Sequence, residues 1–168
     1  MPITATDILF KFSGGAGNSD PNASLGGAMS TTQITSATLH NLFDVVTGAE
    51  SSAGDTEYRG FYVQNNHGTL TWLAPTVWIE SEAASGASVA IALAGEAVNV
   101  AMETIANEST APVGESFTSP TTKGTGLVIA DIPPGQFKGI WIRRVVPTST
   151  GAQAADNAQI RVEGDTNA

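Results

Sequence analysis

The chain has 168 residues, of which 41% are hydrophobic and 14% are charged, and it contains no cysteine. This length suits a single domain with its own hydrophobic core, and the absence of cysteine excludes disulfide bonds and thiolate metal sites. The 16 acidic residues outnumber the 7 basic ones and give a net charge of −9. Because such a surface repels phosphates, nucleic acid is not an expected partner.

No stretch of the sequence has the features of a targeting or membrane segment. Residues 1–4 lack a basic region followed by an apolar run. The most apolar stretch, 88–100, is interrupted by Gly95, Glu96 and Asn99, and it is shorter than the roughly 20 residues that span a bilayer. We therefore expect synthesis in a cytoplasm and no membrane partner.

The first predicted element is a strand over residues 8–12. Ile8, Phe10 and Phe12 alternate with Leu9 and Lys11, which is the two-residue period of a half-buried strand.

A long polar segment, 13–28, follows this strand. It is rich in Gly, Asn, Ser and Asp and has no apolar face to bury, so we predict an extended loop or arm that contacts a neighbouring chain. Its candidate interface residues are Gly14, Gly15, Asn18, Asp20, Asn22 and Leu25. Alternating oxygen ligands at Asn18, Asp20 and Asn22 hint at calcium, but a single carboxylate is too few, and we assign no metal.

One short helix is predicted over residues 39–46. Leu39, Leu42, Phe43 and Val46 follow the spacing of a helix face, and Gly48 stands where such a helix would end. The β-branched run 45–47 favours an extended segment instead, and both alternatives stay open.

The rest of the chain has the pattern of strands. Alternation over residues 58–63, a turn at 65–68 and renewed alternation at Leu70 and Trp72 predict a hairpin. Further strands are expected at 77–79, 89–93, 98–100, 127–129, 137–146 and 159–163. We therefore predict an all-β fold for the single domain 1–168: an antiparallel β-sandwich of the jelly-roll or immunoglobulin-like kind.

The residues with strand periodicity also predict the sandwich core. Its expected members are Phe10, Phe12, Phe61, Val63, Trp78, Ile91, Leu93, Leu127, Ile129, Ile140, Ile142, Ile160 and Val162. Because side chains alternate along a strand, the adjacent Arg143 and Arg144 are predicted to point to opposite faces. One should pair with a carboxylate or an interface while the other meets solvent, and both are candidate interface residues.

Catalysis is not expected. Glu80 and Glu82 share a face at a strand end, and paired carboxylates are the equipment of glycosidases, but such pairs are more often a solvated strand edge. His40 and His67 have no metal-ligand spacing and are expected on a helix surface and in a turn. Aromatic side chains at Tyr58, Tyr62, Trp72, Trp78 and Trp141 suit a sugar-stacking platform or, more simply, core packing.

Two C-terminal stretches, 131–144 (DIPPGQFKGIWIRR) and 160–165 (IRVEGD), carry a resemblance. Together with 13–27 and 54–59 they resemble small structural proteins encoded beside the capsid genes of tailed bacteriophages, and in particular capsid decoration, or cement, proteins.

This resemblance implies a non-enzymatic virion protein that needs no cofactor and is located on the capsid exterior. It implies that the chain binds the major capsid protein of the assembled shell, bridges coat subunits, and forms a homo-oligomer such as a trimer on the lattice. The alternative is a receptor- or carbohydrate-binding module of a tail fibre or baseplate. A hydrolase that uses Glu80 or Glu82 is a third and weaker hypothesis.

Overall fold

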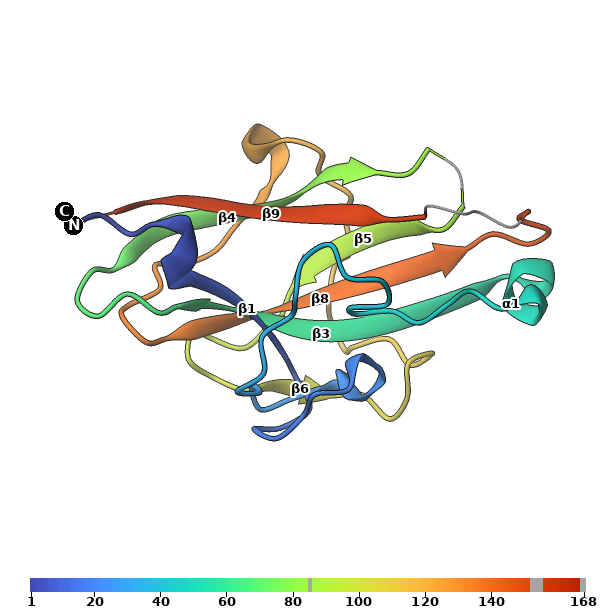
Figure 1. Cartoon of the computed structure of the whole chain (residues 1–168), viewed down its shortest axis with the longest axis horizontal. Coiled ribbons are helices and arrows are strands. Elements are labelled where there is room, and N and C mark those ends of the chain that lie inside the picture. The colour runs from blue at the N-terminus through green and yellow to red at the C-terminus, as the bar shows by residue number, and fades with distance from the viewer. Residues whose placement is uncertain (85, 152–155, 167–168) are drawn as a thin grey trace.

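Two antiparallel sheets lie against each other in the computed structural model, which describes residues 1–84, 86–151 and 156–166 (Figure 1). One sheet has the strand order β1-β3-β8-β5 and the other β7-β4-β9. Their bounds are β1 (Ile8–Phe12), β3 (Asp55–Asn65), β4 (Trp72–Glu82), β5 (Ser88–Leu93), β7 (Leu127–Val128), β8 (Phe137–Val146) and β9 (Ala158–Thr166). The predicted all-β antiparallel sandwich is confirmed.

Shorter elements complete the fold. Strands β2 (Gly26–Gly27) and β6 (Met102–Thr104) pair with each other, and the one α-helix of the described chain is α1 (Gly48–Ala53). Three single turns of 3₁₀ helix are η1 (Ala5–Asp7), η2 (Pro21–Ala23) and η3 (Lys123–Thr125). No described helix is long and apolar enough to cross a membrane.

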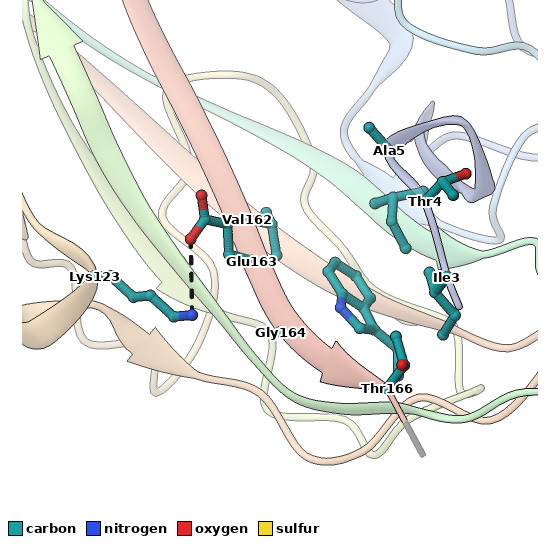
Figure 2. Close-up of a pocket in the computed structure, with 10 residues that line it drawn as sticks. Ile3, Thr4, Ala5, Lys123, Val162, Glu163, Gly164 and Thr166 are labelled. Atoms are coloured by element: carbon teal, nitrogen blue, oxygen red, sulfur yellow. Dashed lines mark ion pairs between the residues drawn. The ribbon is translucent and has the colours of Figure 1, made fainter. Parts of the chain in front are cut away.

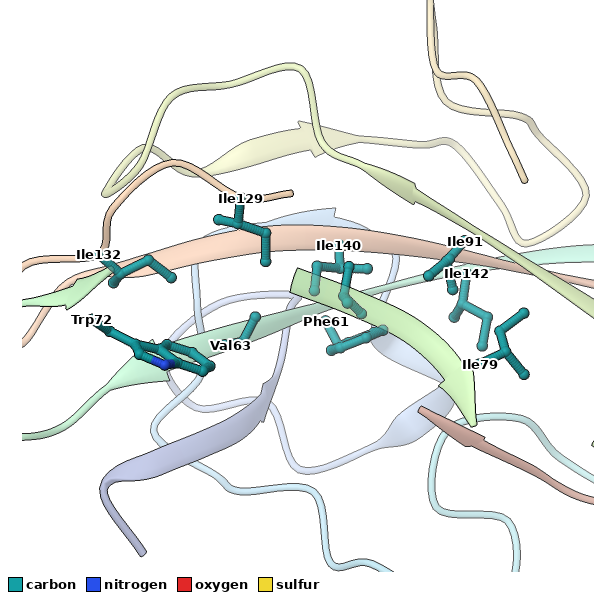
Figure 3. Close-up of a cluster of buried hydrophobic side chains, with 10 residues drawn as sticks. Phe61, Val63, Trp72, Ile79, Ile91, Ile129, Ile132, Ile140 and Ile142 are labelled. Carbon is teal, nitrogen blue, oxygen red and sulfur yellow. The ribbon is translucent and has the colours of Figure 1, made fainter. Parts of the chain in front are cut away.

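The main core lies between the two sheets (Figure 3). The four-stranded sheet contributes side chains such as Phe61 and Ile140, and β4 contributes Val77 and Ile79 from the other side. A second buried cluster lies around Tyr62, Met102 and Trp141. There, a Cβ on Gly60 or Gly139 would lie 2.6 Å from an atom of Met102, so only glycine lets the Met102 side chain lie this close to the sheet.

Most of the predicted core is buried. Phe12, Phe61, Val63, Ile91, Ile129, Ile140 and Ile142 are buried, whereas Phe10, Leu93, Leu127, Ile160 and Val162 are half-buried against the core.

Trp78 is buried as predicted, but it belongs to neither of the two core clusters. Its ring lies 5.8 Å from the Arg161 guanidinium. Between Leu73 and Thr76 the pairing of β4 with β9 shifts by one residue. The extra residue of such a bulge reverses which side chains face inward.

The predicted hairpin is wrong, because β3 and β4 belong to different sheets. The Asn65 side chain donates hydrogen bonds to the carbonyls of Leu70 (2.9 Å) and Ile132 (2.8 Å). These bonds hold a connection that crosses from one sheet to the other. The strand expected at 98–100 is a turn, in which Asn99 has a φ of 64°.

The helix predicted over 39–46 is also absent, and α1 begins at Gly48, where that helix was expected to end. A capping box starts α1: the Thr47 hydroxyl accepts from the Glu50 N–H (3.3 Å), and the Glu50 carboxylate accepts from the Thr47 N–H (2.6 Å). His40, expected on a helix surface, is exposed in the irregular segment with a φ of 56°.

Candidate interaction site

The irregular segment 36–47 covers a large open cavity. The cavity has a volume of about 1160 Å³ and extends from this segment to the ends of β8 and β9. Its apolar lining includes Phe10, Phe61, Ile142 and Ile160. Two apolar side chains of the covering segment, Leu39 and Val45, belong to the lining of this open cavity and are 85% and 59% exposed.

Two arginines of the four-stranded sheet hold this segment in place. The Phe43 ring lies 5.5 Å from the Arg59 guanidinium and 4.8 Å from that of Arg144. Arg144 also donates from Nη1 to the Asp44 carbonyl (2.7 Å) and from Nη2 to the Asp44 carboxylate (3.3 Å). Cation–π and charged hydrogen bonds therefore tie residues 43 and 44 to the sheet.

A buried carboxylate completes this charged cluster. Glu57 is 2% exposed, and its Oε2 accepts a hydrogen bond from Nε of Arg144 (2.5 Å). Burial raises the pKa of Glu57, while the charges of Arg144 and Arg59 oppose that rise. Arg59, with no exposed surface, pairs with Glu108 and also donates to the Asn22 side chain (3.2 Å).

The expectation for the two adjacent arginines is confirmed for Arg144, which pairs with a carboxylate, but Arg143, expected to meet solvent, is only half-exposed. Arg144 is buried and paired with Glu57, whereas the Arg143 guanidinium lies 5.3 Å from the Phe117 ring. Sequence reasoning missed Glu57, Arg59 and Phe43. The alternation over 55–63 places Glu57 and Arg59 on the same face as Phe61 and was the signal that could have found them.

The predicted arm, 13–28, is a loop folded against its own domain. The Gly14 N–H donates to the Gly26 carbonyl (2.7 Å), and the Ser13 hydroxyl donates to the Gly60 carbonyl of β3 (2.7 Å). The Asn18 side chain donates back to the Ser13 carbonyl (2.6 Å). Short polar side chains bond to the backbone here in place of an apolar face.

Two of the eight candidate interface residues are turned into the domain. Leu25 packs against the second core cluster, and Arg144 is buried. The Asp20 carboxylate accepts from the Asn22 N–H (2.9 Å) and caps η2. Of the two glycines in this set, only Gly15 has open space around it: a Cβ added there would have no other atom within 4 Å. Contacts of this loop with a neighbouring chain stay a prediction.

A smaller cavity of about 240 Å³ lies beside β9 (Figure 2). It is lined by Ile3 and its neighbours, by Trp72, and by Val162 and the following residues of β9. At its rim, the Lys123 ammonium lies 3.7 Å from the Glu163 carboxylate.

The side chains considered for catalysis are engaged in local contacts. Glu80 pairs with Arg161, and the Glu82 carboxylate accepts from the Val89 N–H (2.5 Å). His67 lies in the predicted turn and accepts from the Leu70 N–H (3.0 Å). Within residues 1–84, 86–151 and 156–166, no three His, Asp or Glu side chains cluster closely enough to hold a metal ion.

The aromatic platform considered for sugars is not exposed. Trp72, Trp78, Trp141 and Tyr62 are buried, and Tyr58 packs edge-on against Phe117. Comparison of the chain with protein-family models, curated proteins and solved structures finds no match. The covering segment thus offers exposed apolar side chains over a mostly apolar cavity, a surface suited to binding by shape and apolar contact.

Proposed function

We propose that the chain is a non-enzymatic structural virion protein that binds the outer surface of an assembled phage capsid and stabilises it by bridging coat subunits. The observation that carries the proposal is the covering segment 36–47. It exposes Leu39 and Val45, while the charged groups beneath it pair with one another. An exposed apolar surface of this kind can bind a large partner. The charged side chains beneath the segment are already paired with one another inside the chain.

The β-rich architecture and the charge support the same proposal. A rigid sandwich that spans a subunit junction adds contacts that exist only in the assembled shell, so it stabilises that state by mass action. A net charge of −9 opposes binding to a DNA-lined interior and favours the exterior. The resemblance of 131–144 and 160–165 to capsid decoration proteins supplies the partner, which is the major capsid protein.

The test is binding in trans. Purified protein is added to mature capsids from which this protein is missing. The amount of bound protein and the melting temperature of the capsid are then measured. We expect saturable binding and a higher capsid melting temperature. Binding without any gain in capsid stability, or no binding at all, would contradict the proposal.

A matched pair of variants locates the surface. Leu39→Ser with Val45→Ser should weaken capsid binding, yet it should change the free energy of unfolding by less than about 0.5 kcal/mol because both side chains are exposed. Val113→Ser is the control, since Val113 is 83% exposed but lies outside the covering segment. Equal loss of binding in both variants would remove segment 36–47 from the interface.

A further inference from the structure

We infer that the free edge of β9 is a self-association surface, on which a second copy of this chain adds its own β9 in antiparallel register to form one continuous sheet. The inference stands apart from the capsid proposal, because it concerns contacts between two copies alone.

The other long edges of the two sheets are covered. Phe12 at the edge of β1 bonds to the segment beside it, since its N–H donates to the Thr32 carbonyl (3.3 Å). At the edge of β5, Ile91 and Thr118 exchange backbone hydrogen bonds of 2.8 and 3.0 Å. The third edge strand, β7, has only 2 residues. Covering or shortening edge strands is how proteins avoid uncontrolled pairing.

Strand β9 is the exception. Its 9 residues pair with β4 on one side, and no described strand pairs with the other side. It contains no proline, and the extra residues at both register shifts fall on β4, which leaves β9 regular. A long, regular strand without these protections is a template for another strand.

Both halves of this strand border hollows. The cavity of about 240 Å³ is lined by Val162, Glu163, Gly164 and Thr166 of β9. The cavity of about 1160 Å³ is lined by Ala158, Gln159 and Ile160. Ile160 and Val162 of β9 are themselves only half-buried against the core. The chain therefore leaves space along β9.

The sequence of β9 is complementary to itself. Antiparallel pairing centred on Val162 uses all nine residues and places Arg161 opposite Glu163 of the second copy, twice by symmetry. Arg161 and Glu163 both lie on the outward face, are partly exposed and pair with each other within the chain, so the second copy would exchange or extend these exposed ion pairs. Ile160 falls opposite Gly164, and Val162 falls opposite Val162, on the inward face. Opposite charges across strands stabilise a pair.

Neighbouring registers lack this complementarity. When the antiparallel pair is centred on Arg161, the Arg161 side chains of the two copies lie opposite each other. When it is centred on Glu163, the two Glu163 carboxylates lie opposite each other. Like charges directly opposite each other are unfavourable. Charge complementarity therefore selects a second copy of this chain, in one register, as the occupant of the edge.

The first experiment measures mass in solution by light scattering. We expect a concentration-dependent dimer for the wild-type chain. Arg161→Glu should shift it to monomer, and the double change Arg161→Glu with Glu163→Arg should restore the dimer. Lys123→Glu is the control, because it removes an in-chain partner of Glu163 outside the β9 edge. A monomeric wild type, or a dimer that Arg161→Glu leaves unchanged, would overturn the inference.

The second experiment tests the register directly and does not depend on the stability of the charge variants. The chain has no cysteine, so Val162→Cys introduces the only thiol. Directly opposed residues have Cα atoms about 4.5–5.5 Å apart, within the range of a disulfide. Under mild oxidation we expect covalent dimers of Val162→Cys and none of Asp165→Cys, whose two copies lie far apart in this register. Equal crosslinking of the two variants would overturn it.

Discussion

Two segments outside the strands, 13–28 and 36–47, are attached to the sandwich in different ways. The first is held by bonds to its own backbone and to β3, such as the Gly60 N–H donating to the Ser24 carbonyl (2.7 Å). In the described part of the chain, no backbone–backbone hydrogen bond links residues 36–46 to a strand. That segment is held by Phe43 and Asp44 against two arginines. The polar segment 13–28 is therefore an integral part of the fold, whereas the more apolar segment 36–47 covers the sandwich and is attached to it at few points.

The largest expected effect comes from removing the main anchor of the covering segment. Arg144→Met leaves the Glu57 charge buried without its closest partner, and such a loss costs about 3–5 kcal/mol of unfolding free energy. Urea denaturation measures it. Arg143→Met is the control and should cost less than about 1 kcal/mol, because that side chain lies over Phe117 on the other face. Similar losses in both variants would contradict the role given to Arg144.

The matching test for the loop 13–28 is Gly26→Ala. A Cβ at Gly26, which has a φ of 88°, would lie 1.8 Å from the Glu103 carbonyl oxygen, so we expect a loss of about 1–3 kcal/mol. Gly17→Ala meets no atom within 4 Å and should leave stability unchanged or slightly raised. Thermal melting of both variants measures the difference. If Gly26→Ala melts like the wild type, the loop is not packed as described.

The effect of Arg144→Met should depend on pH. Burial raises the pKa of Glu57, and Arg144 opposes that rise, so removing Arg144 moves the pKa further upward. In the variant, Glu57 then gains its proton as the pH falls through this raised value, and the uncompensated buried charge disappears. The stability difference between wild type and Arg144→Met should therefore shrink in acid. A difference that stays constant down to pH 4 contradicts the assignment to Glu57.

The smallest expected effect is a difference in how readily the two segments open in the native protein. Chymotrypsin should cleave the native protein first in segment 36–47, next to the exposed Leu39, because no described backbone hydrogen bond links residues 36–46 to a strand. Segment 13–28 should be protected by its bonds to β3. Mass spectrometry of the first fragments identifies the site. First cleavage next to Leu25 would reverse the comparison.

Strand positions were predictable because alternation is a local signal. Strand β8 has the bounds expected for residues 137–146, and Ile160 and Val162 share one face of β9 as predicted. The capping box at Thr47 and Glu50 was also present in the sequence, but the apolar spacing upstream concealed it. Of those apolar side chains, Leu42 and Phe43 pack against the core from an irregular segment instead of a helix face, whereas Leu39 is exposed.

The parts that were not predictable depend on contacts distant in sequence. The bond from Asn65 to the Ile132 carbonyl joins residues 67 positions apart and helps send β3 and β4 to different sheets. The pairing of Glu57 with Arg144 spans 87 positions. The bulge in β4 reverses the faces of Trp78 and Val77, although the local alternation gives no sign of it.

The most direct test of the proposed capsid role is the copy number of the protein in purified virions of the encoding phage, measured by quantitative gel analysis against the major capsid protein. A decoration protein that occupies the lattice should approach the stoichiometry of the coat protein, and antibodies against it should label heads. A few copies per particle, with label confined to tails or fibres, would contradict the account and support the receptor-binding alternative.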